Sequence, residues 1–83
     1  MTQTGMRALF LEVLARVAPD IDPAQVSDSD HLREDLELDS MDVLNLAAAM
    51  HQRLGIDIPE ADYKEIATVG SAVRYLSAAA GQD

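Results

Sequence analysis

The sequence predicts an all-α fold, a four-helix bundle of three longer helices plus a short third helix. Three segments carry apolar residues at the spacing of one helical face, and no convincing pair of strands appears. A chain of 83 residues fits a single domain. We expect that domain to span residues 1–83, with short flexible ends at about 1–3 and 81–83.

The first helix should cover about residues 4–17. Its apolar positions fall on one helical face: Met6, Phe10, Val13, Leu14 and Val17. Pro19 should end this helix, because the residue before a proline is pushed out of the α region.

A long acidic loop is expected between the first two long helices. Residues 20–42 contain nine acidic residues and one basic residue, Arg33, so they hold −8 of the net charge of −9. One short helical turn is expected at residues 23–26, and Leu32, Leu36 and Leu38 should attach the loop to the core. Loops of this length inside a compact domain are commonly functional.

The second helix should begin at Asp39–Ser40 and end near Leu54, where Gly55 is well placed to stop it. Its core-facing stripe is Val43, Leu46, Ala47, Met50 and Leu54. At 100° per residue, a second apolar set points roughly 100–160° away from that stripe: Met41, Leu44 and Ala48.

The rest of the chain predicts a short helix and a last long helix. Pro59 opens a helical turn that runs through Tyr63 to Ile66, and Thr68 is the expected N-cap of the last helix. The last stripe is Val69, Ala72, Val73, Leu76 and Ala80, and Gly81 should terminate it.

Composition narrows the possible partners. Fifteen acidic against six basic residues repel phosphate backbones and anionic lipid, so we expect no nucleic acid partner and no membrane insertion. The absence of cysteine excludes disulfides, thiolate metal sites and a cysteine nucleophile. We expect a soluble, monomeric, cytoplasmic protein whose partners are proteins.

Catalysis by the chain alone is not expected. Ser40 and His51 share one predicted helix, but eleven residues separate them by roughly 16 Å along its axis, whereas a base must lie within about 3 Å of its proton. We therefore assign no catalytic residue.

An intrinsic metal site is not expected either. Asp28, Asp30 and Asp39 match positions 1, 3 and 12 of a calcium loop, but Leu32 and Arg33 stand where the pattern requires Asp or Asn and then Gly. The acids are better interpreted as a solvated run of charge.

The segment at residues 35–42 carries the functional signal. Capping explains Asp39 and Ser40, but it does not explain an apolar strip beside them that faces away from the core. The motif Asp39-Ser40-Met41-Asp42 resembles the Asp-Ser-Leu-Asp of the acyl carrier protein family, and the resemblance extends over about residues 6–80.

This resemblance implies a non-catalytic carrier. A separate phosphopantetheinyl transferase would attach 4′-phosphopantetheine from coenzyme A to Ser40, with Asp39 helping to bind the magnesium ion used only during attachment. Acyl groups would travel as thioesters on the arm's thiol to acyl-loading and acyl-transferring enzymes of fatty acid, polyketide or related lipid biosynthesis.

Two further sets of residues follow. Partner docking is expected at Asp39, Met41, Asp42, Leu44, Asn45 and Ala48. If the bundle shelters an acyl chain, the walls of the pocket would be Leu46, Met50, Ile58, Ile66, Ala72, Val73 and Leu76. The alternative is a filled core with the cargo held outside.

Departures from the family pattern suggest a specialised carrier rather than the main fatty acid synthase carrier. Asn45, His51 and Gln52 stand where fatty acid carriers place glutamates, and Glu37 replaces a glycine often found before the motif. Two alternatives remain open, a discrete aminoacyl or peptidyl carrier and an unmodified helical protein-interaction module.

Overall fold

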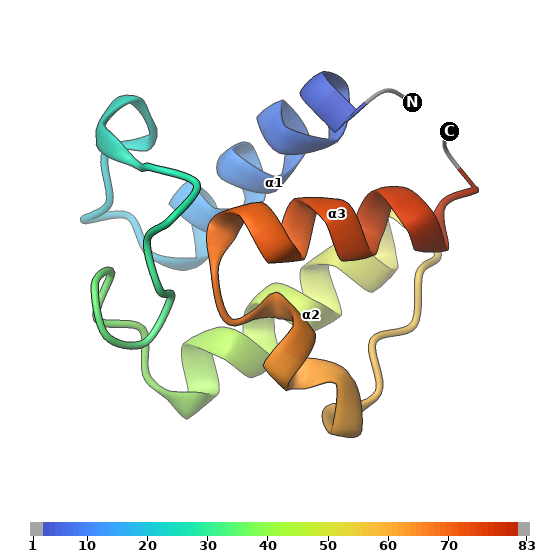
Figure 1. Cartoon of the computed structure of the whole chain (residues 1–83). Coiled ribbons are helices and arrows are strands. Elements are labelled where there is room, and N and C mark those ends of the chain that lie inside the picture. The colour runs from blue at the N-terminus through green and yellow to red at the C-terminus, as the bar shows by residue number, and fades with distance from the viewer. Residues whose placement is uncertain (1–2, 82–83) are drawn as a thin grey trace.

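The computed structural model describes residues 3–81, and its regular elements are all helices (Figure 1). The elements are α1 (Gln3–Val17), η1 (Pro23–Gln25), α2 (Ser40–Leu54), η2 (Glu60–Ile66) and α3 (Val69–Ala79), where η marks a short 3₁₀ helix. Within residues 3–81 the only β pairing is an isolated bridge between His31 and Thr68. The all-α prediction is therefore confirmed.

The expected flexible ends fall mainly outside the described residues. Positions 1, 2, 82 and 83 are not described, and Gln3 already belongs to α1. In the part of the chain that is described, no helix combines the length and apolar character needed to cross a membrane.

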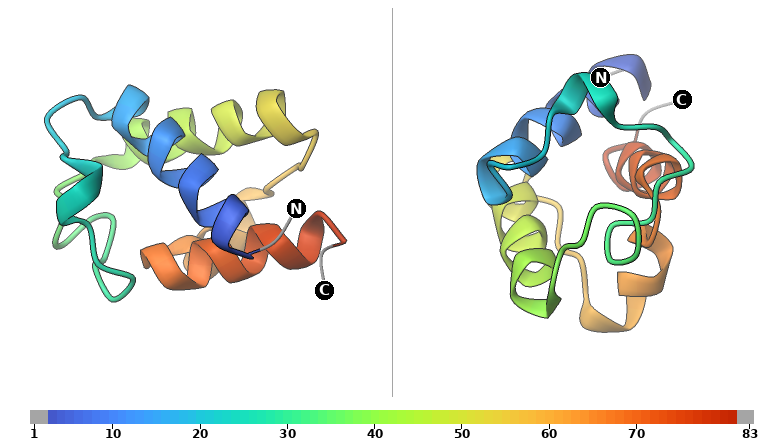
Figure 2. Two further views of the ribbon diagram at one scale, coloured as in Figure 1. Left: turned by 90° about the horizontal axis from the view of Figure 1, so that it is seen from above. Right: turned by 90° about the vertical axis from the view of Figure 1, so that its left-hand side faces the viewer.

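The first helix holds the bundle together. α1 packs against both α2 and α3, and α3 also packs against η2. Seen from above, α1 lies obliquely between α2 and α3, and the long loop before α2 covers one end of the bundle (Figure 2). The start of α2 lies next to this loop, so the loop and α2 together form the surface around Ser40.

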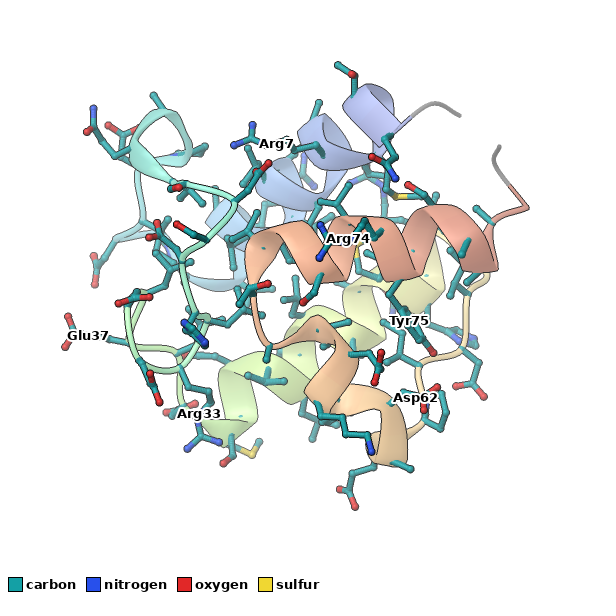
Figure 3. The ribbon with its side chains drawn as sticks, viewed as in Figure 1. Arg7, Arg33, Glu37, Asp62, Arg74 and Tyr75 are labelled. Atoms are coloured by element: carbon teal, nitrogen blue, oxygen red, sulfur yellow. The ribbon has the colours of Figure 1, made fainter. Side chains whose placement is uncertain are left out.

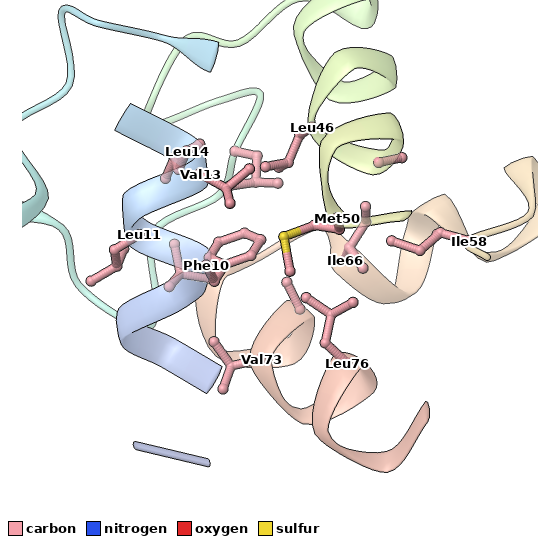
Figure 4. Close-up of a cluster of buried hydrophobic side chains, with 14 of the residues drawn as sticks. Phe10, Leu11, Val13, Leu14, Leu46, Met50, Ile58, Ile66, Val73 and Leu76 are labelled. Atoms are coloured by element: carbon pink, nitrogen blue, oxygen red, sulfur yellow. The ribbon is translucent and has the colours of Figure 1, made fainter. Parts of the chain in front are cut away.

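The core follows the predicted stripes closely (Figure 4). Four of the five predicted positions of α1 are buried: Met6, Phe10, Val13 and Leu14. Val17 is only partly buried, and Leu11, which lies outside the predicted stripe, is buried. Because α1 packs against η1 as well as against α2 and α3, it needs an apolar face wider than a single stripe, which accounts for Leu11.

Local caps set the helix ends. Gly55 follows α2 with φ of 69°, and its N–H donates to the carbonyl oxygen of His51 at 2.7 Å. Thr68 caps α3 reciprocally with Ser71. The predicted stripe of α3 extends too far by one position, because Ala80 is an exposed C-cap, and Gly81 follows it with φ of 74°.

The long loop is attached to the core by its leucines. Leu32 and Leu38 are buried and Leu36 is partly buried, as expected. Apolar side chains spaced along the loop thus hold it against the bundle, which fixes the path of the chain into α2.

Backbone hydrogen bonds tie the same loop to the start of α3. The N–H of Leu32 donates to Ala67 at 2.9 Å, and the N–H of Gly70 donates to Asp28 at 2.8 Å. A Cβ at Gly70 would lie 3.1 Å from the Asp28 oxygen, so this close approach favours glycine. Arg7 of α1 adds an ion pair to Asp28 at 2.7 Å.

Candidate functional site

Ser40 is an exposed residue that occupies the first position of α2. Asp39 precedes it as the N-cap, and the Asp39 carboxylate accepts a hydrogen bond from the Asp42 N–H at 2.8 Å. In return, the Asp39 N–H donates to the Asp42 carboxylate at 3.4 Å. This reciprocal cap satisfies two backbone donors of the first turn and leaves the Ser40 side chain at the surface.

Within residues 3–81, the Ser40 hydroxyl has one side-chain hydrogen-bond partner, Arg33. Nη1 of Arg33 donates to Oγ of Ser40 at 3.2 Å, and Figure 3 places Arg33 beside the start of α2. The sequence identifies Arg33 as the single basic residue of the loop and as a mismatch to the calcium-loop pattern, but it does not predict this contact. The contact depends on how the loop returns to α2, which no spacing pattern reports.

Among the described residues, neither histidine is a hydrogen-bond partner of the Ser40 hydroxyl. His51 is on the same continuous helix, eleven residues on, or about 16 Å along the axis. His31 instead contacts Asp35, whose carboxylate accepts the His31 backbone N–H at 2.7 Å. This backbone hydrogen bond, helped by the His31 side chain, holds the pKa of Asp35 below its ordinary value.

An open cavity of about 440 Å³ lies next to Ser40, between the start of α2 and η2. Its lining is mostly apolar, with one cation from the loop and another from η2: Leu32, Arg33, Ser40, Met41, Val43, Leu44, Glu60, Tyr63, Lys64, Ile66 and Ala67. Of the lining residues from η2, Ile66 was predicted as a wall of an acyl pocket, whereas Glu60, Tyr63 and Lys64 were not predicted, because only the fold brings η2 beside the start of α2.

The second apolar face of α2 is exposed as predicted. Met41 is 62% exposed and Leu44 is 47% exposed, and Ala48 is also exposed. Of the remaining residues expected to dock partners, Asp39 and Asn45 are exposed and Asp42 is partly buried. We call Met41, Leu44 and Ala48 the apolar strip. The strip and Ser40 lie on the same accessible side of α2.

The seven residues expected to wall an acyl pocket are all buried in the core. Figure 4 shows several of them in contact within one cluster that includes α1. Only Ile66 of the seven also lines the cavity beside Ser40. Ile66 therefore joins the core to the surface near the serine.

Glu37 adopts a backbone conformation that normally favours glycine. Its φ is 60°, the single positive value at a residue other than glycine within residues 3–81. The sequence comparison with the family pattern had identified this position as one where glycine is usual. The structure gives the physical reason, because a Cβ is disfavoured in the left-handed region.

Acidic side chains gather at a separate opening behind the loop, of about 590 Å³. Its charged lining residues are Asp20, Asp22, Asp35, Glu37 and Asp42. Even so, no group of three or more acidic or histidine side chains in the described part of the chain is arranged to hold a metal ion.

Known proteins resemble this chain over most of its length. Residues 6–76 match the sequence profile of the phosphopantetheine attachment site family. The acyl carrier protein of Wolinella succinogenes is 39% identical over 56 residues, which cover 68% of this chain and 74% of that protein. The acyl carrier proteins of Helicobacter pylori (strain G27) and Helicobacter acinonychis are each 35% identical over 71 residues, covering 83% of this chain and 91% of theirs.

Proposed function

This chain belongs to the acyl carrier protein family, and from that membership we propose that Ser40 carries the covalent 4′-phosphopantetheine arm of the family. Proteins of this family are carriers rather than catalysts, and the arm supplies a terminal thiol on which acyl groups are held as thioesters. The observation that carries the assignment to Ser40 is its exposed hydroxyl at the first position of α2, inside the motif Asp39-Ser40-Met41-Asp42.

The surroundings of Ser40 fit such an arm. A phosphate attached there would lie beside the backbone N–H groups of the first turn, which favour anions, and beside the guanidinium of Arg33. The neighbouring cavity of about 440 Å³ has largely apolar walls against which a flexible chain could lie. These features support attachment at Ser40 without any rearrangement of α2.

Attachment itself requires a second enzyme. The oxygen of Ser40 would form a P–O bond to the pantetheine phosphate of coenzyme A, the pyrophosphate P–O bond would break, and adenosine 3′,5′-bisphosphate would leave. The serine proton needs a base, because an ordinary hydroxyl is a weak nucleophile. With His51 far along α2 and His31 engaged with Asp35, we propose that a phosphopantetheinyl transferase supplies the base.

Partner enzymes would dock on the start of α2. The proposed surface consists of Asp39, Met41, Asp42, Leu44, Asn45 and Ala48. Across residues 40–54 the charges of Asp42 and Arg53 cancel, so the apolar strip contributes more than charge to recognition. This favours a specialised set of partners over the main fatty acid synthase. We also propose that the carrier is monomeric and works in the cytoplasm.

Cargo could lie in one of two places. Sheltering an acyl chain among the seven predicted pocket residues would require the packed side chains around Ile66 to separate. Each CH₂ group that left water would contribute about 0.8 kcal/mol of favourable free energy. For a chain of several carbons, this offsets part of the free energy needed to separate the packed side chains. A short or polar cargo would instead stay in the open cavity lined by Tyr63 and Leu44.

Intact-mass analysis tests the attachment site. The protein is incubated with coenzyme A, magnesium and a broad-specificity phosphopantetheinyl transferase, and we expect a gain of one phosphopantetheine. Ser40→Ala should abolish the gain, whereas Ser29→Ala, which alters another exposed serine in the loop, should retain it. A gain that survives Ser40→Ala would overturn the assignment.

A further inference from the structure

Two cations near Ser40 are not used by the fold. Three ion pairs are present among residues 3–81, and they engage Arg7, His31 and Arg53. Arg33 and Lys64 form none, yet both line the cavity that contains Ser40. Both residues are exposed, one on the loop and one on η2. Their positive charge is therefore available to a ligand.

The position of Arg33 is unusual for its charge environment. It is followed in sequence by Glu34 and Asp35, but its guanidinium donates to the neutral hydroxyl of Ser40 instead of a carboxylate. Arg33 is also the single basic residue in a stretch with a net charge of −8. The loop thus directs its one positive charge to the proposed attachment point.

We propose that Arg33 is the residue that holds the phosphodiester formed on Ser40, with Lys64 as a weaker second cation across the cavity. This inference rests on the proposed attachment at Ser40. Nη1 of Arg33 already lies 3.2 Å from the oxygen that would become the ester oxygen, and the anionic phosphate oxygens are only one atom further on. A planar guanidinium can donate two parallel hydrogen bonds to such oxygens.

A phosphodiester on Ser40 needs a positively charged partner, because its surroundings are acidic. A phosphodiester adds a negative charge next to Asp39 and Asp42, which lie well within the Debye length of about 8–10 Å. Without a cation, attachment would increase repulsion in an already acidic segment. The positive charge of Arg33 offsets the added negative charge of the phosphodiester. Arg33 would also direct the start of the arm toward the apolar wall formed by Met41 and Leu44.

The test compares melting temperatures of the protein with and without the arm. In the unaltered protein, Arg33 offsets the added charge, so attachment should leave the melting temperature equal or higher. In Arg33→Gln, attachment should lower the melting temperature by several degrees at low salt, and the loss should shrink at high salt because the repulsion is screened. Arg33→Lys should fall between the two, since it keeps the charge but loses the planar fork.

A matched control uses another exposed arginine without an ion pair. Arg74→Gln makes the same charge change on α3, and Figure 3 shows Arg74 away from Arg33, so the effect of attachment should match that in the unaltered protein. The ³¹P chemical shift of the attached phosphodiester should move in Arg33→Gln and stay unchanged in Arg74→Gln. Lys64→Gln should move it less than Arg33→Gln does.

The two proposals fail in distinguishable ways. Absence of any mass gain in the unaltered protein would overturn attachment at Ser40. The role of Arg33 alone would be overturned by a different result. The unaltered protein and Arg33→Gln would then both gain the full mass, show the same change in melting temperature on attachment, and have the same ³¹P chemical shift.

Discussion

Asp39 and Asp42 each accept a hydrogen bond from the other residue's backbone N–H, at 2.8 Å and 3.4 Å, so the two acids enclose Ser40 and Met41 in one capped turn. The cap uses Oδ1 of Asp39. Oδ2 of Asp39 has no hydrogen-bond partner among residues 3–81 and is free to bind a cation carried by a partner enzyme.

Asp39 should therefore have two separable roles. Asparagine caps helices as well as aspartate, so Asp39→Asn should keep the melting temperature but slow attachment of the arm when magnesium is limiting. Asp39→Ala should lose the cap and about 1 kcal/mol of the free energy of unfolding. Urea unfolding and initial rates of mass gain measure the two effects. Equal attachment rates for the aspartate and asparagine forms would contradict the magnesium role.

Replacing Glu37 by glycine should stabilise the fold. The φ of 60° destabilises the folded state by roughly 1–2 kcal/mol for a residue with a Cβ, and glycine removes this strain. The greater conformational freedom of glycine in the unfolded chain cancels about half of that gain in stability. We expect the free energy of unfolding to rise by about 0.5–1 kcal/mol. Glu34→Gly removes the same charge at a position without positive φ and should destabilise. A loss of stability in Glu37→Gly would contradict this prediction. It would show that contacts of the Glu37 side chain stabilise the fold by more than the backbone strain destabilises it.

Ser77 and Ser71 should respond in opposite directions to the same substitution. The Ser77 hydroxyl is buried without a hydrogen-bond partner among the described residues, so Ser77→Ala should raise the free energy of unfolding by up to about 1 kcal/mol. Ser71 forms the cap of α3 with Thr68, so Ser71→Ala should lower it by about 1 kcal/mol. Chemical denaturation of both variants tests the pair, and a loss at Ser77 would point to a role in packing.

The hydrogen bond from Tyr75 to Asp62 should make stability depend on alkaline pH. The phenol donates to the carboxylate at 2.7 Å, and Figure 3 shows the two side chains facing each other. This bond, with burial, raises the pKa of Tyr75 above its ordinary 10.0. Because the folded pKa is the higher one, the contribution is complete below pH 10.0 and is lost as pH rises through the raised pKa.

The variant Tyr75→Phe tests this dependence. It should be less stable than the unaltered protein by about 0.5–1.5 kcal/mol at neutral pH, and the difference should close as the pH rises through the raised pKa of Tyr75. Melting temperatures of both proteins across that range provide the measurement. A difference that stays constant to the alkaline limit would remove the hydrogen bond as its cause.

The apolar strip should contribute to partner recognition without contributing to stability. Leu44 is half exposed, so Leu44→Ser should leave the melting temperature nearly unchanged. It should lower kcat/KM of a phosphopantetheinyl transferase by about 5- to 10-fold, the effect of losing roughly 1 kcal/mol at an interface. Gln52→Ser, on the same helix but outside the strip, should have no effect. Equal rates for both variants would exclude the strip from docking.

The helix ends were predictable because local chemistry sets them. Asp39, Gly55 and Thr68 are capping residues whose effect reaches only the adjacent turn, so the sequence is sufficient to locate them. The exposure of Met41 and Leu44 was predictable for a similar reason, since helical period alone separates them from the core stripe.

Contacts between distant segments were not predictable. The approach of Arg33 to Ser40 depends on the path of the loop, and the cavity beside Ser40 depends on where η2 packs. The burial of Leu11 depends on the packing of α2, α3 and η1 around α1. Glu37 was recognised as a departure from the family pattern, but its φ could come only from coordinates.

The hydrogen bonds that join the acidic loop to Ala67 and Gly70 make the loop part of the same cooperative unit as the last helix. Fraying of the first turn of α3 would deprive Leu32 and Asp28 of their partners at once, so amide protons on both segments should exchange with solvent at similar rates. An opening motion at the start of α3 would therefore reach Ser40 through the backbone of the loop.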